Sequence, residues 1–473
     1  MSWPSIADIA AKVRSGELKA ADLVEQALAA IADKSEYQAI IATTEGRARE
    51  RAAAIDAAIK NGEKPGPLAG VPFIAKDNFL AFGAETTAAS NILKGFNAPY
   101  QASAIERLEQ AGAVCVAKAN LDAFAHGAST ENSDFMVTKN PHDTTRVPGG
   151  SSGGSAASVV LELAPFALGT DTGGSIRLPA SFTGCVGYKP TYGLVSRSGV
   201  VAMASSTDVI GPLARTVDDA ALVLDVMAGR DPLDSTTIDH DQAGYINLDA
   251  SSLAGKKIGV ITEYMSEGLD DGVRARIEAA IEKLKAAGAE VQQLSLPSLS
   301  LALAVYYIVC PAEVSSNLSR YDGQRYGFSA ADAADLEESF SKTRAQGFGA
   351  EAKRRIMIGT YVLSSGYYDA YYRKAQTVRT KLINEFEAAF KQVDFLVGPV
   401  APSTAFPIGW NTHDPLQMYL IDIMTVAASL TGIPAISIPA GLAGNLPVGL
   451  QLMAPSRQDR ELLAVAKATE ALL

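Results

Sequence analysis

The hydrophobic pattern of this chain changes its period repeatedly, from helix-like to strand-like. Residues 103–112 and 271–288 carry apolar side chains every three or four positions, and short, largely apolar runs follow them at 113–118 and 289–294. The first spacing is typical of an amphipathic helix, and a short apolar run bounded by turn residues is typical of a buried strand. Repeated helix–strand alternation predicts an α/β layered fold around a mainly parallel or mixed sheet.

Other elements follow from the same pattern. Ser5 and Thr216 precede apolar-periodic stretches and are expected to cap helices over 5–13 and 216–227. We also expect helices over 21–31, 46–60 and 369–391, and strands over 37–42, 68–76, 257–262, 395–397 and 435–438. Because no internal repeat or long linker divides the chain, we expect one domain over 1–473, with an N-terminal helical segment at about 1–62 and an irregular helical insert at about 295–350.

Composition narrows the class of protein. Of 473 residues, 48% are apolar and 20% charged, which is typical of a globular protein with a large core. The net charge of −11 repels phosphate groups, so direct tight binding of nucleic acid by this chain alone is not expected. We find no run of 18 apolar residues and no basic N-terminal segment leading into an apolar one, so we expect a cytoplasmic protein without a membrane span.

The cysteines and histidines carry little chemistry in this sequence. Cys115, Cys185 and Cys310 are widely spaced in apolar or small-residue surroundings, which favours buried free thiols. The four histidines show no H-E-x-x-H pattern and no paired ligand spacing, so a zinc hydrolase is disfavoured and no metal is expected.

Two glycine–serine segments, 147–155 and 171–177, are the candidate site of chemistry, and the small-residue segment between them is expected to form a helix and then a strand. Glycines leave backbone N–H groups uncovered, so they can surround a serine nucleophile with donors for an oxyanion. A phosphate cradle is disfavoured because no lysine follows the glycines as it does in the P-loop pattern. A nucleophile elbow would fit the G-x-S-x-G string around Ser151, but an elbow needs a strand leading into the serine.

One expected strand, 68–76, is apolar and ends on a lysine. Burying Lys76 costs free energy unless it is paired or neutral, so one interpretation is that it pairs with Asp77 or extends into solvent. The other is a general base, because a lysine whose pKa of about 10.4 is lowered by about three units can accept a proton near pH 7. A second serine could carry the proton between such a lysine and a nucleophilic serine.

Lys76, Ser151 and Ser175 lie in segments that resemble the amidase signature family, through the motifs Gly-Gly-Ser-Ser-Gly-Gly-Ser and Asp-Thr-Gly-Gly-Ser-Ile-Arg. The resemblance implies an α/β amidase signature fold, with a large central mixed β-sheet covered by helices on both faces. It implies Ser175 as the nucleophile, Ser151 as a bridging serine that follows a cis peptide bond, and Lys76 as the general base. It also implies an oxyanion hole at Thr172, Gly173 and Gly174.

Seven further segments narrow this resemblance, which covers nearly the whole chain. They are similar to the glutamine-hydrolysing subunits of tRNA-dependent amidotransferases and span residues 306–307, 312–318, 321–323, 353–356, 366–372, 414–422 and 446–451. That similarity implies a pocket for free glutamine, because its α-carboxylate suits an arginine and its α-ammonium suits an aspartate. The residues implied in these roles are Arg355 and Asp422, with Tyr306 lining the pocket.

One segment departs from the family pattern. Relatives usually read Asp-Glu-Phe-Ala-Met-Gly where residues 122–127 of this chain have Ala123 and His126. The segment borders the pocket in the family, so His126 either alters substrate contacts or pH behaviour, or is a neutral replacement.

The resemblance also implies an assembly of three different subunits, in which this chain is the one that hydrolyses glutamine. The ammonia would pass to a B subunit, which would amidate Glu-tRNA(Gln) or Asp-tRNA(Asn) with ATP and Mg²⁺ and would hold the tRNA. A small C subunit would wrap around this chain. No cofactor is implied in the chain itself. The alternatives are a stand-alone amidase for a small amide, a non-catalytic scaffold, which an intact triad disfavours, and a phosphate- or nucleotide-binding protein.

Overall fold

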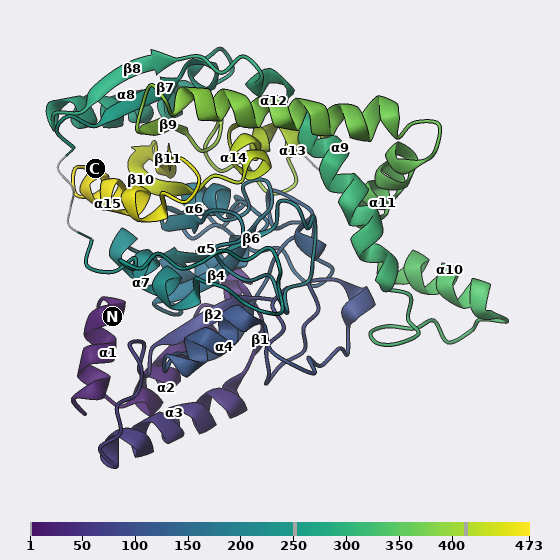
Figure 1. Cartoon of the computed structure of the whole chain (residues 1–473). Coiled ribbons are helices and arrows are strands. Elements are labelled where there is room, and N and C mark those ends of the chain that lie inside the picture. Colours follow the sequence, from purple (N-terminus) through teal and green to yellow (C-terminus); the bar gives the residue numbers. More distant parts are fainter. Residues whose placement is uncertain (1, 249–252, 411–414) are drawn as a thin grey trace.

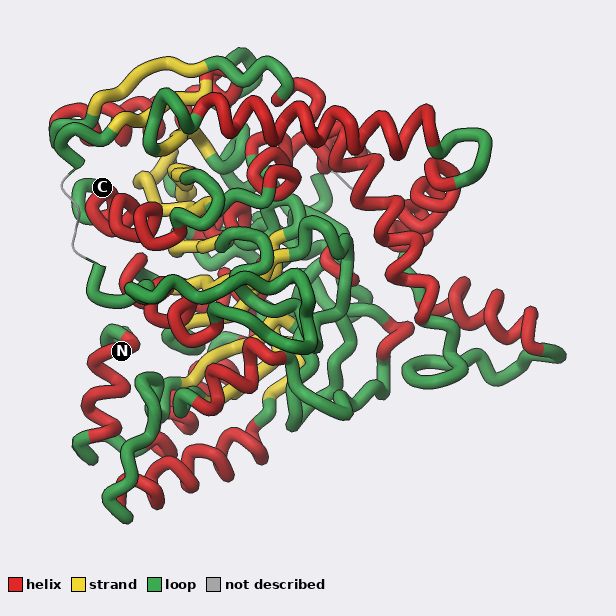
Figure 2. Tube along the Cα trace, viewed as in Figure 1, coloured by secondary structure: helices red, strands yellow, loops and turns green. Residues whose placement is uncertain are grey.

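The structure is a computed structural model that describes residues 2–248, 253–410 and 415–473. Asp414, the first residue of one segment that carries the family resemblance, therefore lies outside the described residues. Through the described residues runs one 11-stranded sheet in the order β1-β3-β2-β4-β6-β5-β10-β11-β9-β7-β8. Figures 1 and 2 show this sheet in the middle of the molecule with helices around it.

Buried strands at the centre of the sheet carry the candidate residues. β2 lies between β3 and β4 and is parallel to both, whereas β4 is antiparallel to β6. Every residue of these four strands is buried, which explains their near-continuous apolar runs. The strands are β1 (Ile40–Thr43), β2 (Pro72–Lys76), β3 (Val114–Ala119), β4 (Phe166–Asp171), β5 (Val186–Lys189), β6 (Val209–Ala214), β7 (Lys257–Ile261), β8 (Glu290–Leu294), β9 (Phe395–Pro399), β10 (Ala435–Ala443) and β11 (Leu446–Met453).

Helices cover both faces of the sheet, as expected. α4, α7 and α15 pack in one connected layer, and α5 and α6 pack against each other in another. The α-helices are α1 (Ile6–Arg14), α2 (Ala20–Asp33), α3 (Glu45–Lys60), α4 (Ser103–Gln110), α5 (Gly153–Val160), α6 (Arg177–Thr183), α7 (Val217–Met227), α8 (Asp271–Ala286), α9 (Leu299–Asn317), α10 (Leu336–Gly347), α11 (Ala350–Leu363), α12 (Lys374–Ala389), α13 (Pro415–Leu420), α14 (Val426–Thr431) and α15 (Asp459–Glu470).

The expected helix caps are confirmed. The Ser5 hydroxyl accepts a hydrogen bond from Asp8 N, and the Thr216 hydroxyl accepts one from Asp219 N. The long helix predicted over 369–391 is present, but its first turn, Asp369–Arg373, is a π-helix that continues into α12.

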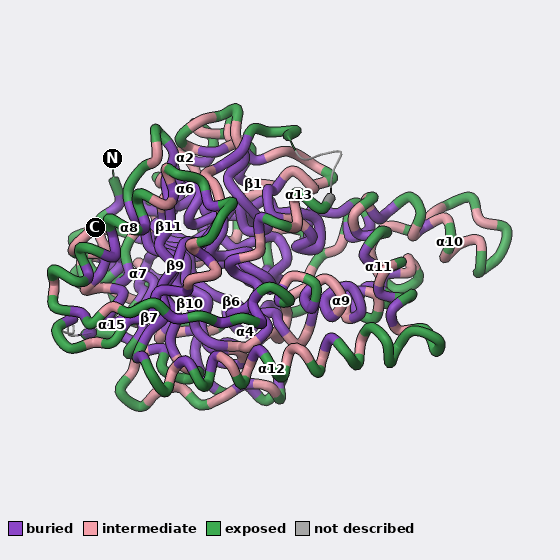
Figure 3. Tube along the Cα trace, turned by 90° about the horizontal axis from the view of Figure 1, so that it is seen from above, coloured by how far each residue is buried: buried purple, intermediate pink, exposed green. Residues whose placement is uncertain are grey.

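α9 and α10 lie in the region 295–350, where an irregular helical insert was expected, and α11 follows directly after it. α9 packs against α11, α12 and α14, and α10 projects away from the body of the molecule (Figure 3). The segment Leu299–Arg320 is apolar and long enough to cross a membrane by length and composition, although its sequence has no unbroken run of 18 apolar residues. Half of that segment is buried inside the fold. Core helices of globular proteins pass the same test of length and composition, so this one helix is weak evidence for a membrane span.

Candidate active site

Lys76 lies at the carboxyl end of β2 and is fully buried. Its Nζ donates hydrogen bonds to Ser151 Oγ at 2.8 Å, to Ser152 Oγ at 2.9 Å and to Thr170 Oγ1 at 2.9 Å. Burial lowers the pKa of Lys76 to about 7, because a charge without water around it is costly, although three nearby carboxylates act in the opposite direction. A lysine with this pKa can exchange a proton at neutral pH.

The alternative interpretation of Lys76 is wrong. Asp77 forms its ion pair with Lys118, whose Nζ lies 2.7 Å from Asp77 Oδ1, and both side chains are fully buried. Lys76 therefore neither pairs with its neighbour nor extends into solvent. Its contacts are the hydroxyl groups of one glycine–serine segment and of β4.

Ser151 follows a cis peptide bond to Gly150. A side chain at position 150 would overlap Asp122 Oδ2 and Ser129 N, so only glycine allows this close approach. The residues before Ser151 form turns and irregular backbone in place of a strand, so the nucleophile elbow is not formed. α5 begins immediately afterwards, at Gly153.

Ser175 lies in the loop between β4 and α6 and is 7% exposed. Its backbone oxygen accepts a hydrogen bond from Ser152 N at 3.1 Å, which brings the two serine segments together. Among the described residues, the Ser175 hydroxyl has no hydrogen-bond partner. The structure thus brings Lys76 and Ser151 into contact, and places Ser175 beside them without a hydroxyl–hydroxyl bond.

The loop that precedes Ser175 is anchored on both sides. Thr172 Oγ1 donates to Asp208 Oδ1 at 2.8 Å, and Thr425 Oγ1 donates to the Gly173 carbonyl at 2.6 Å. Gly174 has a φ of 143°, and Thr425 leaves no room for a side chain there. The anchors hold the backbone of this loop in one conformation, as an oxyanion site requires.

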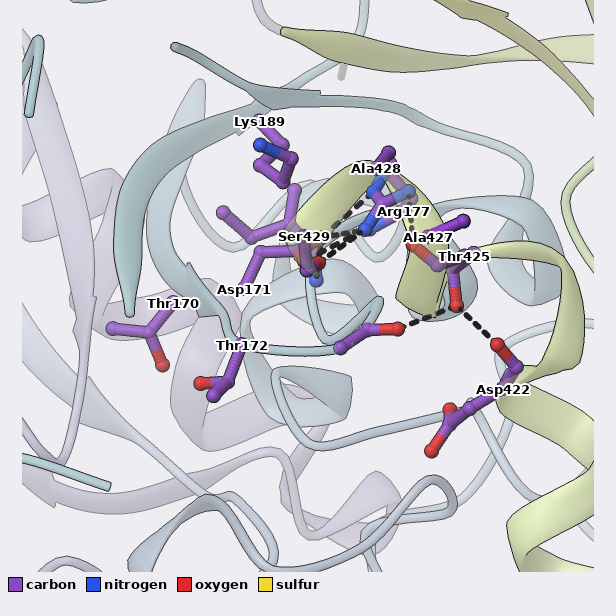
Figure 4. A network of polar contacts seen from close by, with 12 residues as sticks. Thr170, Asp171, Thr172, Arg177, Lys189, Asp422, Thr425, Ala427, Ala428 and Ser429 are labelled. Atoms are coloured by element: carbon purple, nitrogen blue, oxygen red, sulfur yellow. Dashed lines mark hydrogen bonds and ion pairs between the residues drawn. The ribbon is translucent and has the colours of Figure 1, made fainter. Parts of the chain in front are cut away.

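Arg177 connects this loop to Thr425 and Ser429 around α14 (Figure 4) and to Gln451 on β11. Its Nε and Nη2 donate to the two carboxylate oxygens of Asp171 at 3.0 and 2.9 Å, and its Nη1 donates to Gln451 Oε1 at 2.6 Å. It also donates to the Thr425 carbonyl and to Ser429 Oγ, both at 3.0 Å. The role of Arg177 was not predicted from the sequence. The signal that could have indicated it is an arginine among small residues close to Asp171. The contacts of Ser152, Thr170 and Asp208 were not predicted either.

The three residues expected to bind substrate lie on three elements around the same loop. Tyr306, on α9, packs its ring so closely against Gly173 that any side chain at position 173 would overlap it. Arg355, on α11, is 3% exposed, and its guanidinium lies 5.5 Å from the centre of the Tyr307 ring. Asp422, in a 3-10 turn (Ile421–Met424), accepts a hydrogen bond from the Tyr307 hydroxyl at 3.2 Å. Tyr307 therefore lies between the cationic and the anionic group.

The surroundings of Arg355 and Asp422 leave each side chain able to bind a ligand group of opposite charge. Arg355 donates through Nε to Glu351 at 2.9 Å, which is its only hydrogen bond among the described residues, so its terminal nitrogens are free for a ligand. Burial raises the pKa of Asp422 to about 7, although Arg355 and the Tyr307 hydroxyl favour its anion.

Two cavities flank the buried lysine. One, of about 280 Å³, is lined among others by Asp122, His126 and Arg355, and the other, of about 220 Å³, by Asn78, Thr170 and Asp208. Asp122, in the wall of the first cavity, packs on Gly150, and Thr170, in the wall of the second, contacts Lys76. The Lys76–Ser151 pair therefore lies between the two cavities. Within the described ranges, no three His, Cys, Asp or Glu side chains are grouped to hold a metal ion. The three cysteines are buried and free, as predicted.

Comparisons with known proteins identify the family to which this chain belongs. The amidase profile matches residues 22–463, and the chain belongs to the amidase family. Among relatives, it is 51% identical over 467 residues to the A subunit of glutamyl-tRNA(Gln) amidotransferase from Carboxydothermus hydrogenoformans, a match that covers 98% of this chain and 96% of the relative.

Solved structures agree with this assignment. The A subunit of glutamyl-tRNA(Gln) amidotransferase from Thermotoga maritima is 40% identical, with a TM-score of 0.78 over 95% of this chain and 91% of that one. The peptide amidase of Stenotrophomonas maltophilia is 32% identical, with a TM-score of 0.83 over 99% of this chain and 96% of that one. Proteins named for different activities thus share this fold. The chain is more similar in sequence to these amidotransferase subunits than to the peptide amidase.

Proposed function

We propose that this chain is the glutamine-hydrolysing subunit of a tRNA-dependent amidotransferase. The observation that carries the proposal is the placement of Arg355 and Asp422 on either side of Tyr307, next to the loop that bears Ser175. A free amino acid has a carboxylate and an ammonium group at one end, and these two side chains match both charges. The amidotransferase relatives at about half identity support the same substrate.

In the proposed first half-reaction, Ser175 Oγ attacks the carboxamide carbon of glutamine. Ser175 loses its proton to Ser151, which passes its own proton to neutral Lys76. Backbone N–H groups of Thr172, Gly173 and Gly174 stabilise the oxyanion. The C–N bond then breaks, Lys76 returns the proton through Ser151 to the leaving nitrogen, and ammonia and a glutamyl ester of Ser175 are formed.

The second half-reaction uses the same groups in reverse. Water attacks the glutamyl ester and gives a proton through Ser151 to Lys76. The ester bond breaks, the proton returns to Ser175 Oγ, and glutamate leaves. The missing Ser151–Ser175 hydrogen bond does not count against this route, because catalytic hydrogen bonds often tighten only once substrate is bound.

The released ammonia would be used by partner proteins. In this proposal, the B subunit uses it, with ATP and Mg²⁺, to amidate Glu-tRNA(Gln) or Asp-tRNA(Asn), and the small C subunit binds this chain. The net charge of −11 fits this division, since the RNA would be bound by the partner. The proposed location is the cytoplasm, where translation takes place.

The test is ammonia release from glutamine by the wild type and Ser175→Ala, alone and co-expressed with the B and C subunits. We expect activity that is lost in Ser175→Ala, kept in the exposed control Ser300→Ala, and increased by the partners. If glutamine is inert in every combination while peptide amides or other simple amides are cleaved, the chain is a stand-alone amidase. That second candidate is favoured by the structural likeness to the peptide amidase.

A further inference from the structure

His126 lies in a rigid loop beside the proposed substrate pocket. A 3-10 turn, Ala123–Ala125, precedes it, and Phe124 and Ala125 have φ angles of 53° and 64° in the left-handed region. The backbone N–H of His126 donates to the Ala123 carbonyl at 3.0 Å, and its carbonyl accepts from Asn132 Nδ2 at 2.7 Å. These bonds fix the point from which the imidazole ring extends.

The imidazole ring of His126 is fully buried, and neither ring nitrogen has a hydrogen-bond partner among the described residues. Buried polar groups are nearly always hydrogen-bonded, since an unsatisfied one destabilises the fold. His126 lines the cavity of about 280 Å³ together with Arg355 and Tyr307. Two unsatisfied nitrogens in the wall of this cavity indicate a ligand that satisfies at least one of them.

The surrounding charges keep this histidine neutral. Burial and the charge of Arg355 hold the pKa of His126 well below its usual value. A neutral imidazole offers one N–H donor and one acceptor. The other ionisable groups that line the cavity come from the chain segment around His126 and from α9, α11 and α13. They are Asp122 and Glu131 near His126, Tyr307 on α9, Glu351 and Arg354 on α11, and Tyr419 on α13.

We propose that His126 is a substrate-binding residue whose ring N–H donates a hydrogen bond to the α-carboxylate that Arg355 binds. This inference rests on the proposed function. The carboxylate end of the substrate is favoured because Arg355 and His126 line the same cavity, whereas Asp422 is not among its lining residues. The His126 ring has no surface exposed to water, so the proposed hydrogen bond requires the ring to turn toward the carboxylate.

The experiment compares two substrates in the complex with the partner subunits. The first is glutamine, and the second is 4-aminobutanamide, which keeps the amine and the carboxamide and lacks the α-carboxylate. Ammonia release is measured for the wild type, for His126→Phe, which keeps a planar ring without nitrogen, and for His126→Gln, which restores an N–H donor. Phe124→Leu is the control, because Phe124 packs on Tyr321 and Phe348 and its loss loosens the same loop.

For His126→Phe we expect KM for glutamine to rise about tenfold with kcat within about twofold, as loss of one hydrogen bond to a charged group predicts. His126→Gln should recover most of the loss, and 4-aminobutanamide should be hydrolysed equally by all three proteins. Phe124→Leu should affect both substrates alike. The inference is overturned if His126→Phe also affects both substrates alike, or leaves KM for glutamine unchanged. If the wild type does not hydrolyse glutamine at all, the proposed function has failed instead.

Discussion

At the scale of single residues, the hydrogen bonds around Lys76 favour one of its serine neighbours in the proposed proton route. A charged lysine has three N–H donors, and three hydroxyl oxygens accept them. Neutral Lys76 has a lone pair, so one hydroxyl must turn and donate. Ser152 already donates to the Thr170 carbonyl at 3.2 Å, and Thr170 Oγ1 also accepts from Asn78. Ser151 Oγ has no other partner among the described residues, so of the two serines Ser151 is better able to donate its proton to neutral Lys76.

Lys76 and Asp422 give a prediction on pH. Both have a pKa of about 7. In the proposed mechanism both must be deprotonated in the free enzyme before glutamine reacts, because Lys76 accepts a proton and Asp422 binds an ammonium group. Below pH 7, kcat/KM for glutamine should therefore fall with a limiting slope near two on a logarithmic plot, about one for each group. An amide without an α-ammonium group, such as 4-carbamoylbutanoate, should show a slope of about one, because only Lys76 then matters.

The measurement is ammonia release on both sides of neutral pH with both amides, and Asp422→Asn serves as the matched variant. Asp422→Asn should reduce the slope for glutamine to that of the other amide and leave the other profile unchanged. Equal slopes for the two amides in the wild type would show that Asp422 does not titrate with substrate binding.

At the scale of elements, the contact between α9 and α11 positions Arg355. Gly359 lies one turn after Arg355 on α11, and a side chain there would overlap the carbonyl of Pro311 on α9. Gly359→Ala should therefore push α11 away from α9 and move Arg355 with it. We expect KM for glutamine to rise several-fold, while hydrolysis of an amide without a carboxylate changes little. Steady-state kinetics check this, with Gly366→Ala as control, because no atom lies within 4 Å of a side chain at position 366. Equal kinetics for Gly359→Ala and Gly366→Ala would contradict it.

The elements differ in how far the sequence could predict them. β2, β3 and β4 are apolar runs, and all three strands were predicted, as were the caps at Ser5 and Thr216, which are local signals. β6 was missed because Gly211 and Pro212 interrupt its apolar run, although Gly211 is needed where the Tyr188 carbonyl approaches.

Some residues of the candidate site could be predicted from the sequence, and others are brought there only by tertiary contacts. Motif resemblance indicated Lys76, Ser151 and Ser175 as the candidate triad, whereas the local sequence pattern alone left open that Lys76 pairs with Asp77 or extends into solvent. Asp208 could not be found from spacing, since it reaches Thr172 only through the antiparallel pairing of β4 and β6. Thr425 contacts Gly173 across 252 residues of sequence, and hydrophobic periodicity carries no signal for such a contact.

At the scale of the whole molecule, Arg177 joins segments that lie far apart in the chain. Its partners are Asp171 on β4, Thr425 and Ser429 around α14, and Gln451 on β11, all fully or almost fully buried. The Arg177 side chain thus links β4 to β11, which are separated in the sheet by β6, β5 and β10, and it lies next to the proposed oxyanion loop. Arg177 is satisfied at every contact, so its charge is tolerated in the core.

Removing Arg177 should therefore destabilise the whole fold. Arg177→Leu leaves the Asp171 carboxylate buried without its cation, a change that costs about 3–5 kcal/mol in comparable cases. We expect a clearly lower urea midpoint of unfolding, together with loss of glutamine hydrolysis, because the loop 172–175 is held by the same partners. Arg230→Leu breaks the exposed ion pair to Asp239 and should leave the midpoint close to that of the wild type. If both variants unfold at the wild-type midpoint while only Arg177→Leu loses activity, Arg177 positions the loop without stabilising the sheet.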